Sequence, residues 1–152
     1  MTVPPALSSL LEDFAFVDRS ERAELLIEFA DKFKDVPQRI AKRPFPEENH
    51  VRRCESEAFV WYEDQPDGTY KYHFAVENPQ GLSAKAWAVI MDDTLSGAPL
   101  EEVAAVSPEV IFDIFGKELS MGKGQGLMGM LDHVTLAAKR KLRARASSQT
   151  PA

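Results

Sequence analysis

The stretch from Ala58 to Glu77, AFVWYEDQPDGTYKYHFAVE, decides the fold class. Residues 59–62 are aromatic or β-branched and favour a strand. The turn-forming residues Gln, Pro, Asp and Gly follow at 65–68. Apolar residues then recur at every second position from Tyr70 to Val76, which is typical of a half-buried strand. The stretch therefore predicts an antiparallel hairpin with one face on the core.

A two-stranded hairpin is marginally stable alone, so we expect helices to cover it, with a third short strand drawn from residues 45–53. Before the hairpin, a short helix is expected over residues 7–14. A second helix begins at Asp18 and Glu21, which have capping-box spacing, and its apolar residues recur at helical intervals up to Phe33. Pro37 marks the region where this helix has ended, and residues 37–50 read as a loop.

After the hairpin the pattern is helical. Asn78-Pro79 is expected to start a helix that stops before Gly97, and two shorter helices follow at 99–106 and 107–115. The run MGKGQG at 121–126 reads as a glycine-rich joint before a last helix from about 125 to 145. Helices on one side of a small antiparallel sheet define an α+β domain. The positions expected to be apolar and buried in these helices are Leu82, Ala86, Trp87, Val89, Ile90, Val110, Ile111, Ile114, Phe115, Leu127, Met130, Leu131, Val134, Leu136 and Ala138.

The length of 152 residues predicts a single domain over 1–152, with a core at about 8–143 and frayed ends at 1–6 and 146–152. No apolar run reaches the roughly 20 residues of a membrane-spanning helix, and the N-terminus does not read as a signal peptide. One cysteine forms no internal disulfide, so we expect a reducing, cytoplasmic location.

The net charge of −6 is unevenly distributed. Five of the 18 basic residues lie between 139 and 145, which leaves 13 basic against 24 acidic residues elsewhere. An acidic body argues against broad nucleic-acid binding. The basic end either complements the dipole of a long helix or docks an acidic partner, and the sequence leaves both interpretations open.

The glycine and histidine patterns give little support for a nucleotide-binding or metal-binding site. Gly124, Gly126 and Gly129 have dinucleotide-fingerprint spacing but no preceding strand, so we interpret them as a flexible joint and a close helix contact. The spacing of the three histidines and the cysteine matches no common metal site. His73 is expected on the polar face of its strand, and His133 as a packed histidine in the last helix.

Cys54, the only cysteine, lies between charged residues in the run HVRRCESE at 50–57. Arg52 and Arg53 favour the thiolate, whereas Glu55 and Glu57 oppose it. From the residues alone, a reactive thiol and an inert buried one are equally open. A single thiol cannot run a CxxC redox cycle, but it can carry a group through a covalent intermediate.

Two segments resemble the SufE family of sulfur-acceptor proteins. The run VRRCES from Val51 to Ser56 is similar to the family's V-x-G-C-x-S signature. The run LSMGKGQGLMGM at 119–130 is similar to L-[ST]-x-x-R-x-x-G-L-x-x-M. This chain has Arg53 in place of the usual glycine, Phe59 where tryptophan is common, and Lys123 in place of arginine.

The resemblance implies a SufE/IscU-like fold and a persulfide carried on Cys54, with Val51, Arg53 and Ser56 supporting the loop. It also implies that Lys123 and Gln125 contact either the site or the partner. The implied partners are a SufS-type cysteine desulfurase, which would carry pyridoxal phosphate, and an iron–sulfur scaffold as sulfur acceptor. The chain itself would need no cofactor or metal and would be an accessory protein in sulfur transfer rather than a stand-alone enzyme. The resemblance also implies that the resting loop hides Cys54. Two alternatives stay open: a regulatory partner with a structural Cys54, and an unrelated protein with an inert thiol.

Overall fold

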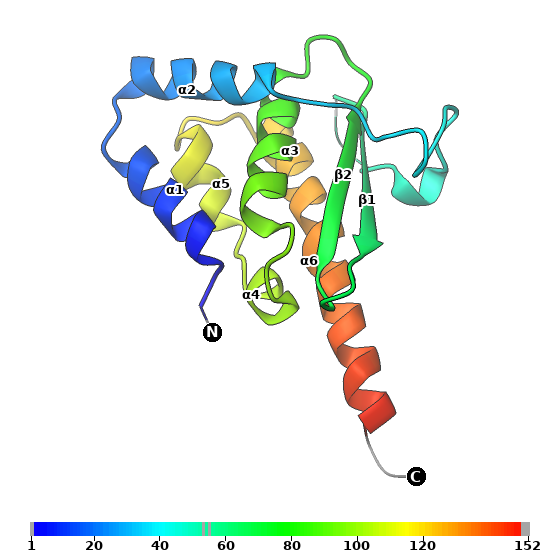
Figure 1. Cartoon of the computed structure of the whole chain (residues 1–152). Coiled ribbons are helices and arrows are strands. Elements are labelled where there is room, and N and C mark those ends of the chain that lie inside the picture. The colour runs from blue at the N-terminus through cyan, green and yellow to red at the C-terminus, as the bar shows by residue number, and fades with distance from the viewer. Residues whose placement is uncertain (1, 53, 55, 150–152) are drawn as a thin grey trace.

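The computed structural model describes residues 2–52, 54 and 56–149, with only the backbone of residue 149. Its mixture of helices and one small antiparallel sheet confirms the predicted α+β class (Figure 1). In chain order the elements are α1 (Pro5–Ala15), α2 (Arg19–Asp31), the 3-10 helix η1 (Glu47–Asn49), β1 (Ala58–Asp64), β2 (Tyr70–Val76), α3 (Leu82–Leu95), α4 (Leu100–Ala104), α5 (Glu109–Phe115) and α6 (Met121–Gln149).

The predicted hairpin is confirmed. β1 and β2 pair antiparallel in a register that runs from Ala58 opposite Val76 to Asp64 opposite Tyr70. In the turn, Asp67 Oδ1 accepts hydrogen bonds from the backbone N–H and the hydroxyl of Thr69. Gly68 has a φ of 87°, a conformation that strongly favours glycine. The turn chemistry and the strand pattern therefore select the same register.

Both faces of the hairpin are covered, so the expectation of a half-buried sheet is wrong. Val60, Tyr72 and Phe74 face the main core, which α3 and α6 complete on that side (Figure 1). The opposite face carries Trp61 and Ala75, packed beneath residues that precede β1 in the chain. The helices thus cover one face as predicted, and a loop covers the other.

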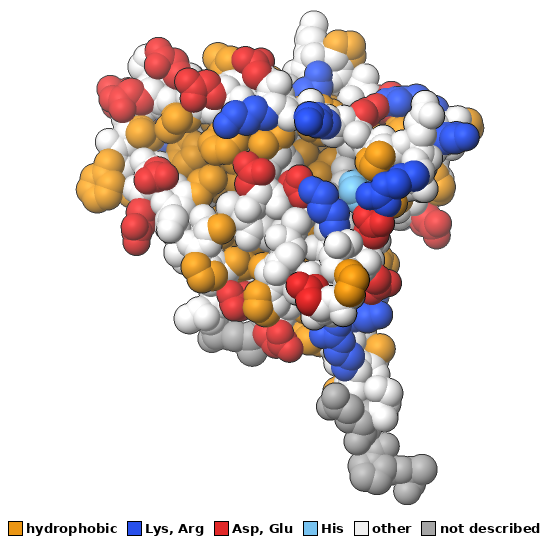
Figure 2. Space-filling view, viewed as in Figure 1, with side chains coloured by type: hydrophobic (Ala, Val, Ile, Leu, Met, Phe, Trp, Pro, Cys, Tyr) orange, Lys and Arg blue, Asp and Glu red, His pale blue; other side chains and the backbone are white. Residues whose placement is uncertain are grey.

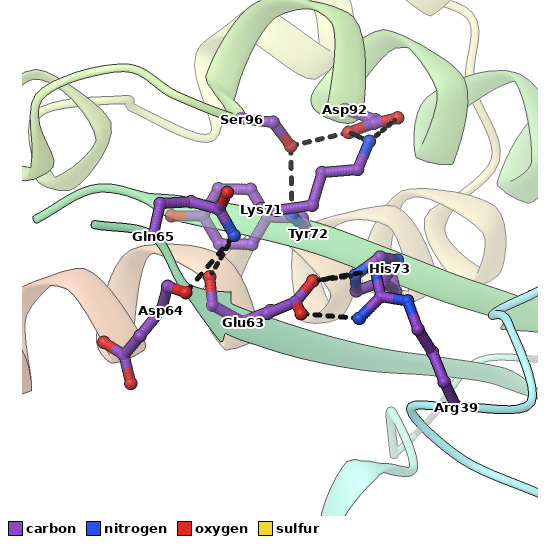
Figure 3. Close-up of polar contacts among 9 residues, drawn as sticks. All are labelled: Arg39, Glu63, Asp64, Gln65, Lys71, Tyr72, His73, Asp92 and Ser96. Carbon is purple, nitrogen blue, oxygen red and sulfur yellow. Dashed lines mark hydrogen bonds and ion pairs between the residues drawn. The ribbon is translucent and has the colours of Figure 1, made fainter. Parts of the chain in front are cut away.

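That loop, residues 33–49, is called the strap here. Its Val36 donates a backbone hydrogen bond to Phe74 O at 2.8 Å and packs with Trp61 and Ala75. His73, predicted on a polar face, is buried under the strap, where its Nε2 lies 3.0 Å from Glu63 Oε1 (Figure 3). The third strand expected from 45–53 is reduced to one isolated bridge between His50 and Phe59, because the strap follows the face of the sheet instead of pairing with its edge.

The second helix begins where the sequence predicts. Asp18 caps α2 by accepting a 2.8 Å hydrogen bond from the backbone N–H of Glu21. Arg22 then joins α2 to the end of α5, because its Nη1 donates to the carbonyls of Asp113 and Ile114. The expected fraying of residues 1–6 is partly wrong, since α1 already begins at Pro5.

α3 begins later than predicted. Asn78 does not cap a helix; its side chain accepts from the backbone N–H of Gln80 and forms a turn, so α3 starts at Leu82. Ala86, Trp87 and Ile90 are buried as expected, whereas Val89 is partly exposed and Leu82 is exposed. The side chains of α3 that are buried are Ala84, Ala86, Trp87, Ala88, Ile90, Met91, Thr94 and Leu95.

α6 is longer at both ends than predicted. It begins at Met121, so the expected glycine-rich joint is a helical segment, and it continues through the predicted frayed residues to 149. Leu127, Met130, Leu131, Val134 and Ala138 are buried as expected, but Leu136 is exposed. In Figure 1 the C-terminal part of α6 projects beyond the other elements.

Charged side chains are unevenly distributed on the face shown in Figure 2. Asp and Glu side chains gather over α1 and the start of α2, whereas Lys and Arg side chains are interspersed with acidic ones over the hairpin and the strap. None of the described helices is both long and apolar enough to cross a bilayer.

Candidate functional site

Cys54 lies on a loop that leaves the strap at His50 and enters β1 after Glu57; residues 50–57 are called the cysteine loop here. Arg53 and Glu55, for which the sequence suggested roles, lie outside the described residues. The loop is closed at its base by a 2.9 Å hydrogen bond from Val51 N–H to Ala58 O. The Cys54 side chain is buried, with 8% of its surface exposed. In this structure the thiol is therefore held inside the protein.

The surface on which Cys54 rests is built from the glycines of α6. A Cβ atom added at Gly126 would lie 3.4 Å from Cys54 Sγ and 3.3 Å from its Cα. One turn on, a Cβ atom at Gly129 would lie 2.8 Å from Cγ1 of Val51, which is fully buried. Gly124 has no such neighbour, because its added Cβ would meet only Leu119 and Met128 side chains at 3.8 Å.

Glycine inside a helix costs roughly 1 kcal/mol relative to alanine, so the four glycines between 122 and 129 weaken the first turns of α6. Two of them leave the space into which the cysteine loop packs. The close helix contact expected from the sequence is present, although its partner is the cysteine loop. α6 itself is held to α3 by a buried 3.0 Å hydrogen bond from Trp87 Nε1 to Leu127 O.

Gly81, just before α3, forms the other side of the site, and the sequence analysis does not identify it. A Cβ atom there would lie 3.0 Å from Ser56 Cβ and 2.8 Å from Val76 Cγ1. The turn before it pairs with the cysteine loop, because Asn78 N–H donates to Ser56 O at 3.1 Å. An Asn-Pro pair followed by glycine is a turn signal, but it does not show which segment the turn packs against.

Cys54 and Ser56 open onto a cavity of about 330 Å³. Lys123, near the start of α6, lines the same cavity, together with Ser83 and Leu127. The structure thus brings together residues from the two motifs, which are almost 70 positions apart in the sequence. Gln125, the other residue expected near a partner, is exposed and is not among the residues that line this cavity.

Lys123 and Ser83 also line a second cavity of about 570 Å³. Arg19, Arg22 and Lys117 contribute to it, and Glu118 pairs with Arg19 at 2.8 Å. Cationic side chains therefore extend from the cysteine cavity across the start of α6 on an otherwise acidic protein. Such a surface favours anionic groups that approach Cys54.

The base of the cysteine loop contacts further ionisable groups. His50 Nε2 lies 2.9 Å from Glu57 Oε2, and its Nδ1 lies 3.2 Å from Glu47 Oε1. His133 of α6 is half-buried and hydrogen-bonds the His50 backbone. Burial lowers the pKa of His133, which agrees with the packed histidine expected from the sequence. Among the described residues, no group of three or more His, Cys, Asp or Glu side chains could hold a metal ion.

The fold and the site together define a class: an α+β domain whose single thiol is carried on a loop over a helix. Residues 8–138 match the sequence profile of the SufE family, described as the Fe-S metabolism associated domain, so this chain belongs to that family and is associated with Fe–S metabolism.

Relatives in sequence and in structure agree. An uncharacterized SufE-like protein of Mycobacterium tuberculosis, found in strains CDC 1551 / Oshkosh and H37Rv, is 26% identical over 147 residues, covering 93% of this chain and 94% of the relative. The solution structure of a hypothetical protein from Thermus thermophilus superposes with a TM-score of 0.72 at 26% identity, covering 93% of this chain and 99% of that one.

Proposed function

We propose that this protein accepts sulfane sulfur on Cys54 from a cysteine desulfurase, stimulates that enzyme, and passes the sulfur to iron–sulfur cluster assembly. The observation that carries the proposal is the seat of Cys54 against Gly126, opening onto a cavity shared with Lys123, in a chain of the SufE family. The donor is a SufS-type desulfurase carrying pyridoxal phosphate, and the acceptor is an iron–sulfur scaffold. No cofactor is assigned to this chain.

In the proposed transfer, the Cys54 thiolate attacks the outer sulfur of the donor's persulfide. The S–S bond to the donor cysteine breaks, the donor leaves as a thiolate, and a persulfide forms on Cys54. No net oxidation or reduction occurs, so a single cysteine is sufficient. Lys123, on the wall of the cavity, provides a positive charge near the anionic sulfur species.

The buried position of Cys54 fits this chemistry, because an exposed thiolate or persulfide is readily oxidised. The thiol must leave its seat to reach a donor, and docking of the desulfurase would supply the contacts that favour the open loop. The exposed Arg52 lies on this loop and can help orient the encounter.

The direct test is intact mass after incubation with a desulfurase and cysteine. The parent protein should gain one or more sulfur atoms, which a reductant removes, and Cys54→Ser should lose both the adduct and most of the stimulation. The alternative is a regulatory partner in which Cys54 is structural. Full stimulation by Cys54→Ser, or an unmodified Cys54 during stimulated turnover, would reject sulfur transfer and support that alternative.

The proposed role of Lys123 is tested by comparing two exposed lysines. Lys123→Ala should slow sulfur transfer with little change in melting temperature, because it removes the charge at the cysteine cavity. Lys117→Ala is the matched control, since Lys117 lines the second cavity but not the cavity at Cys54. Equal transfer rates for parent and Lys123→Ala would exclude a functional role for this side chain.

A further inference from the structure

Two side chains at opposite ends of the cysteine loop meet across its base. His50 precedes the loop's buried Val51, and Glu57 is the last residue before β1. The 2.9 Å contact between His50 Nε2 and Glu57 Oε2 joins these ends outside the backbone hydrogen bond of Val51 to Ala58. Opening the loop by separating its ends requires that this contact break.

His50 is well placed to hold its partner. Its side chain is 19% exposed, and its ring packs on Phe59 with a centroid distance of 4.9 Å. Glu47 lies against the other ring nitrogen, and His133 hydrogen-bonds the His50 backbone from α6. Contacts with η1, β1 and α6 thus fix the position of His50. Its contact with Glu57 connects this fixed residue to the other end of the cysteine loop.

Glu57 has a backbone conformation that is unfavourable for its residue type. Its φ of 53° lies in the left-handed region, which glutamate rarely adopts. The conformation directs its N–H to Cys54 O at 3.0 Å, and its own carbonyl accepts from Glu77 N–H at 3.1 Å. A strained residue persists when its surroundings over-determine it, and the bond to His50 is one of these constraints.

We propose that the His50–Glu57 pair is a latch that keeps Cys54 seated against α6 and sets the fraction of molecules in which the loop is open. Glu57 is a positioning residue, since its carboxylate contacts His50 and acts on Cys54 through the backbone. The role of the latch in sulfur transfer rests on the proposed function, but its effect on thiol exposure does not.

Alkylation of Cys54 by iodoacetamide in the free protein measures the open fraction when opening is faster than reaction. Glu57→Gln should raise the alkylation rate roughly two- to fivefold, as expected when a partly exposed hydrogen bond loses its charged acceptor. Glu48→Gln is the matched control: it removes the same charge from η1, and its rate should equal that of the parent. Unchanged melting temperatures would establish that only the loop has responded.

A double-mutant cycle identifies the partner. His50→Gln should also raise the rate, and the His50→Gln/Glu57→Gln double variant should be no faster than the faster single variant. An unchanged rate for Glu57→Gln would overturn the latch. Fully multiplicative effects in the double variant would show that the two side chains act independently, and would also overturn it.

The kinetics of sulfur transfer from a desulfurase distinguish a latch from a purely structural role of Glu57. A more open loop lowers the conformational penalty of docking, so Glu57→Gln should lower the concentration giving half-maximal transfer and leave the maximal rate unchanged. A lower maximal rate at unchanged half-saturation would contradict the latch. If alkylation responds as expected but Cys54 never takes up sulfur, the latch stands and the proposed function fails.

Discussion

The strap and the cysteine loop are consecutive in the chain, yet they are held to the hairpin by different kinds of contact. The strap is held along its length by ion pairs and aromatic packing. Arg39 binds Glu63 through two hydrogen bonds (Figure 3). Phe45 packs on Trp61 at a centroid distance of 4.9 Å. The described part of the cysteine loop is held by the buried side chain of Val51 and by close packing on the glycines of α6. The contact between His50 and Glu57 joins its two ends.

Arg43 adds a further network on the strap. It pairs with Asp35 at 2.6 Å and with Glu77 at 2.9 Å, and its guanidinium lies 4.8 Å from the centroid of the Phe45 ring. Breaking one of these contacts leaves the others in place. From the described residues, we therefore expect the strap to stay in place when the cysteine loop opens.

The largest expected effect comes from the apolar anchor of the cysteine loop. Val51→Ala removes most of a fully buried side chain, and complete burial of valine is worth about 1.5–3 kcal/mol. If most of this acts on loop opening, alkylation of Cys54 should accelerate roughly ten- to a hundredfold, because 1.4 kcal/mol is a factor of ten. A rate that matches the parent would mean that the loop does not open at Val51.

A smaller effect is expected from filling the space that the glycines of α6 leave for the cysteine loop. Gly129→Ala places a Cβ atom 2.8 Å from Val51 Cγ1, so the loop or the helix must shift. Overpacking costs about 1–3 kcal/mol, and a shift of the helix takes up part of this cost, so alkylation of Cys54 should become several-fold faster.

Two variants test this explanation. Gly124→Ala has room for its methyl group, so it should raise the melting temperature and leave the alkylation rate unchanged. Adding Val51→Ala to Gly129→Ala removes the clashing methyl groups, so the two effects should be less than multiplicative. If both alanine variants behave alike, the close contact of Gly129 has no special role.

The smallest effect on the thiol is expected from the strap. Hydrogen bonds from Arg39 and His73 lower the pKa of Glu63 to about 2, from an ordinary value of 4.5. A depressed carboxyl pKa contributes stability that is present above the ordinary value and is lost as pH falls through the folded value. The parent should therefore lose stability between about pH 5 and pH 2, and Glu63→Gln should lose less over that window.

Melting temperatures of both proteins across this range are the measurement. At neutral pH, Glu63→Gln should leave Cys54 alkylation within twofold of the parent, because the strap and the cysteine loop open separately. A large increase in thiol reactivity would show instead that they open as one unit, which would remove the distinction between them.

Much of the fold could be predicted from local signals. Alternation and turn chemistry identified β1 and β2, the Asp18 cap identified the start of α2, and Gly116 identified the end of α5. Each of these signals acts between residues close in sequence. The two motifs that identified the family are also local, although nothing in either one shows that they meet.

The errors fall where distant segments compete with local preference. Glycine disfavours a helix, so 121–126 was read as a joint; in the folded chain α6 includes these residues because its glycines admit the cysteine loop. Alternation along β2 predicted an exposed face, but the strap covers it and buries His73 against Glu63. Strand periodicity reports the direction of a side chain and does not report what lies over it.

By itself, the sequence determined the class of fold, the order of its elements and the single cysteine that we propose as the sulfur carrier. Only the tertiary structure decided that Cys54 is buried, that Lys123 shares its cavity, and that Gly126, Gly129 and Gly81 form its surroundings. The physical reason is that propensity and periodicity are properties of neighbouring residues. Burial and close approach depend on which distant segments pack together.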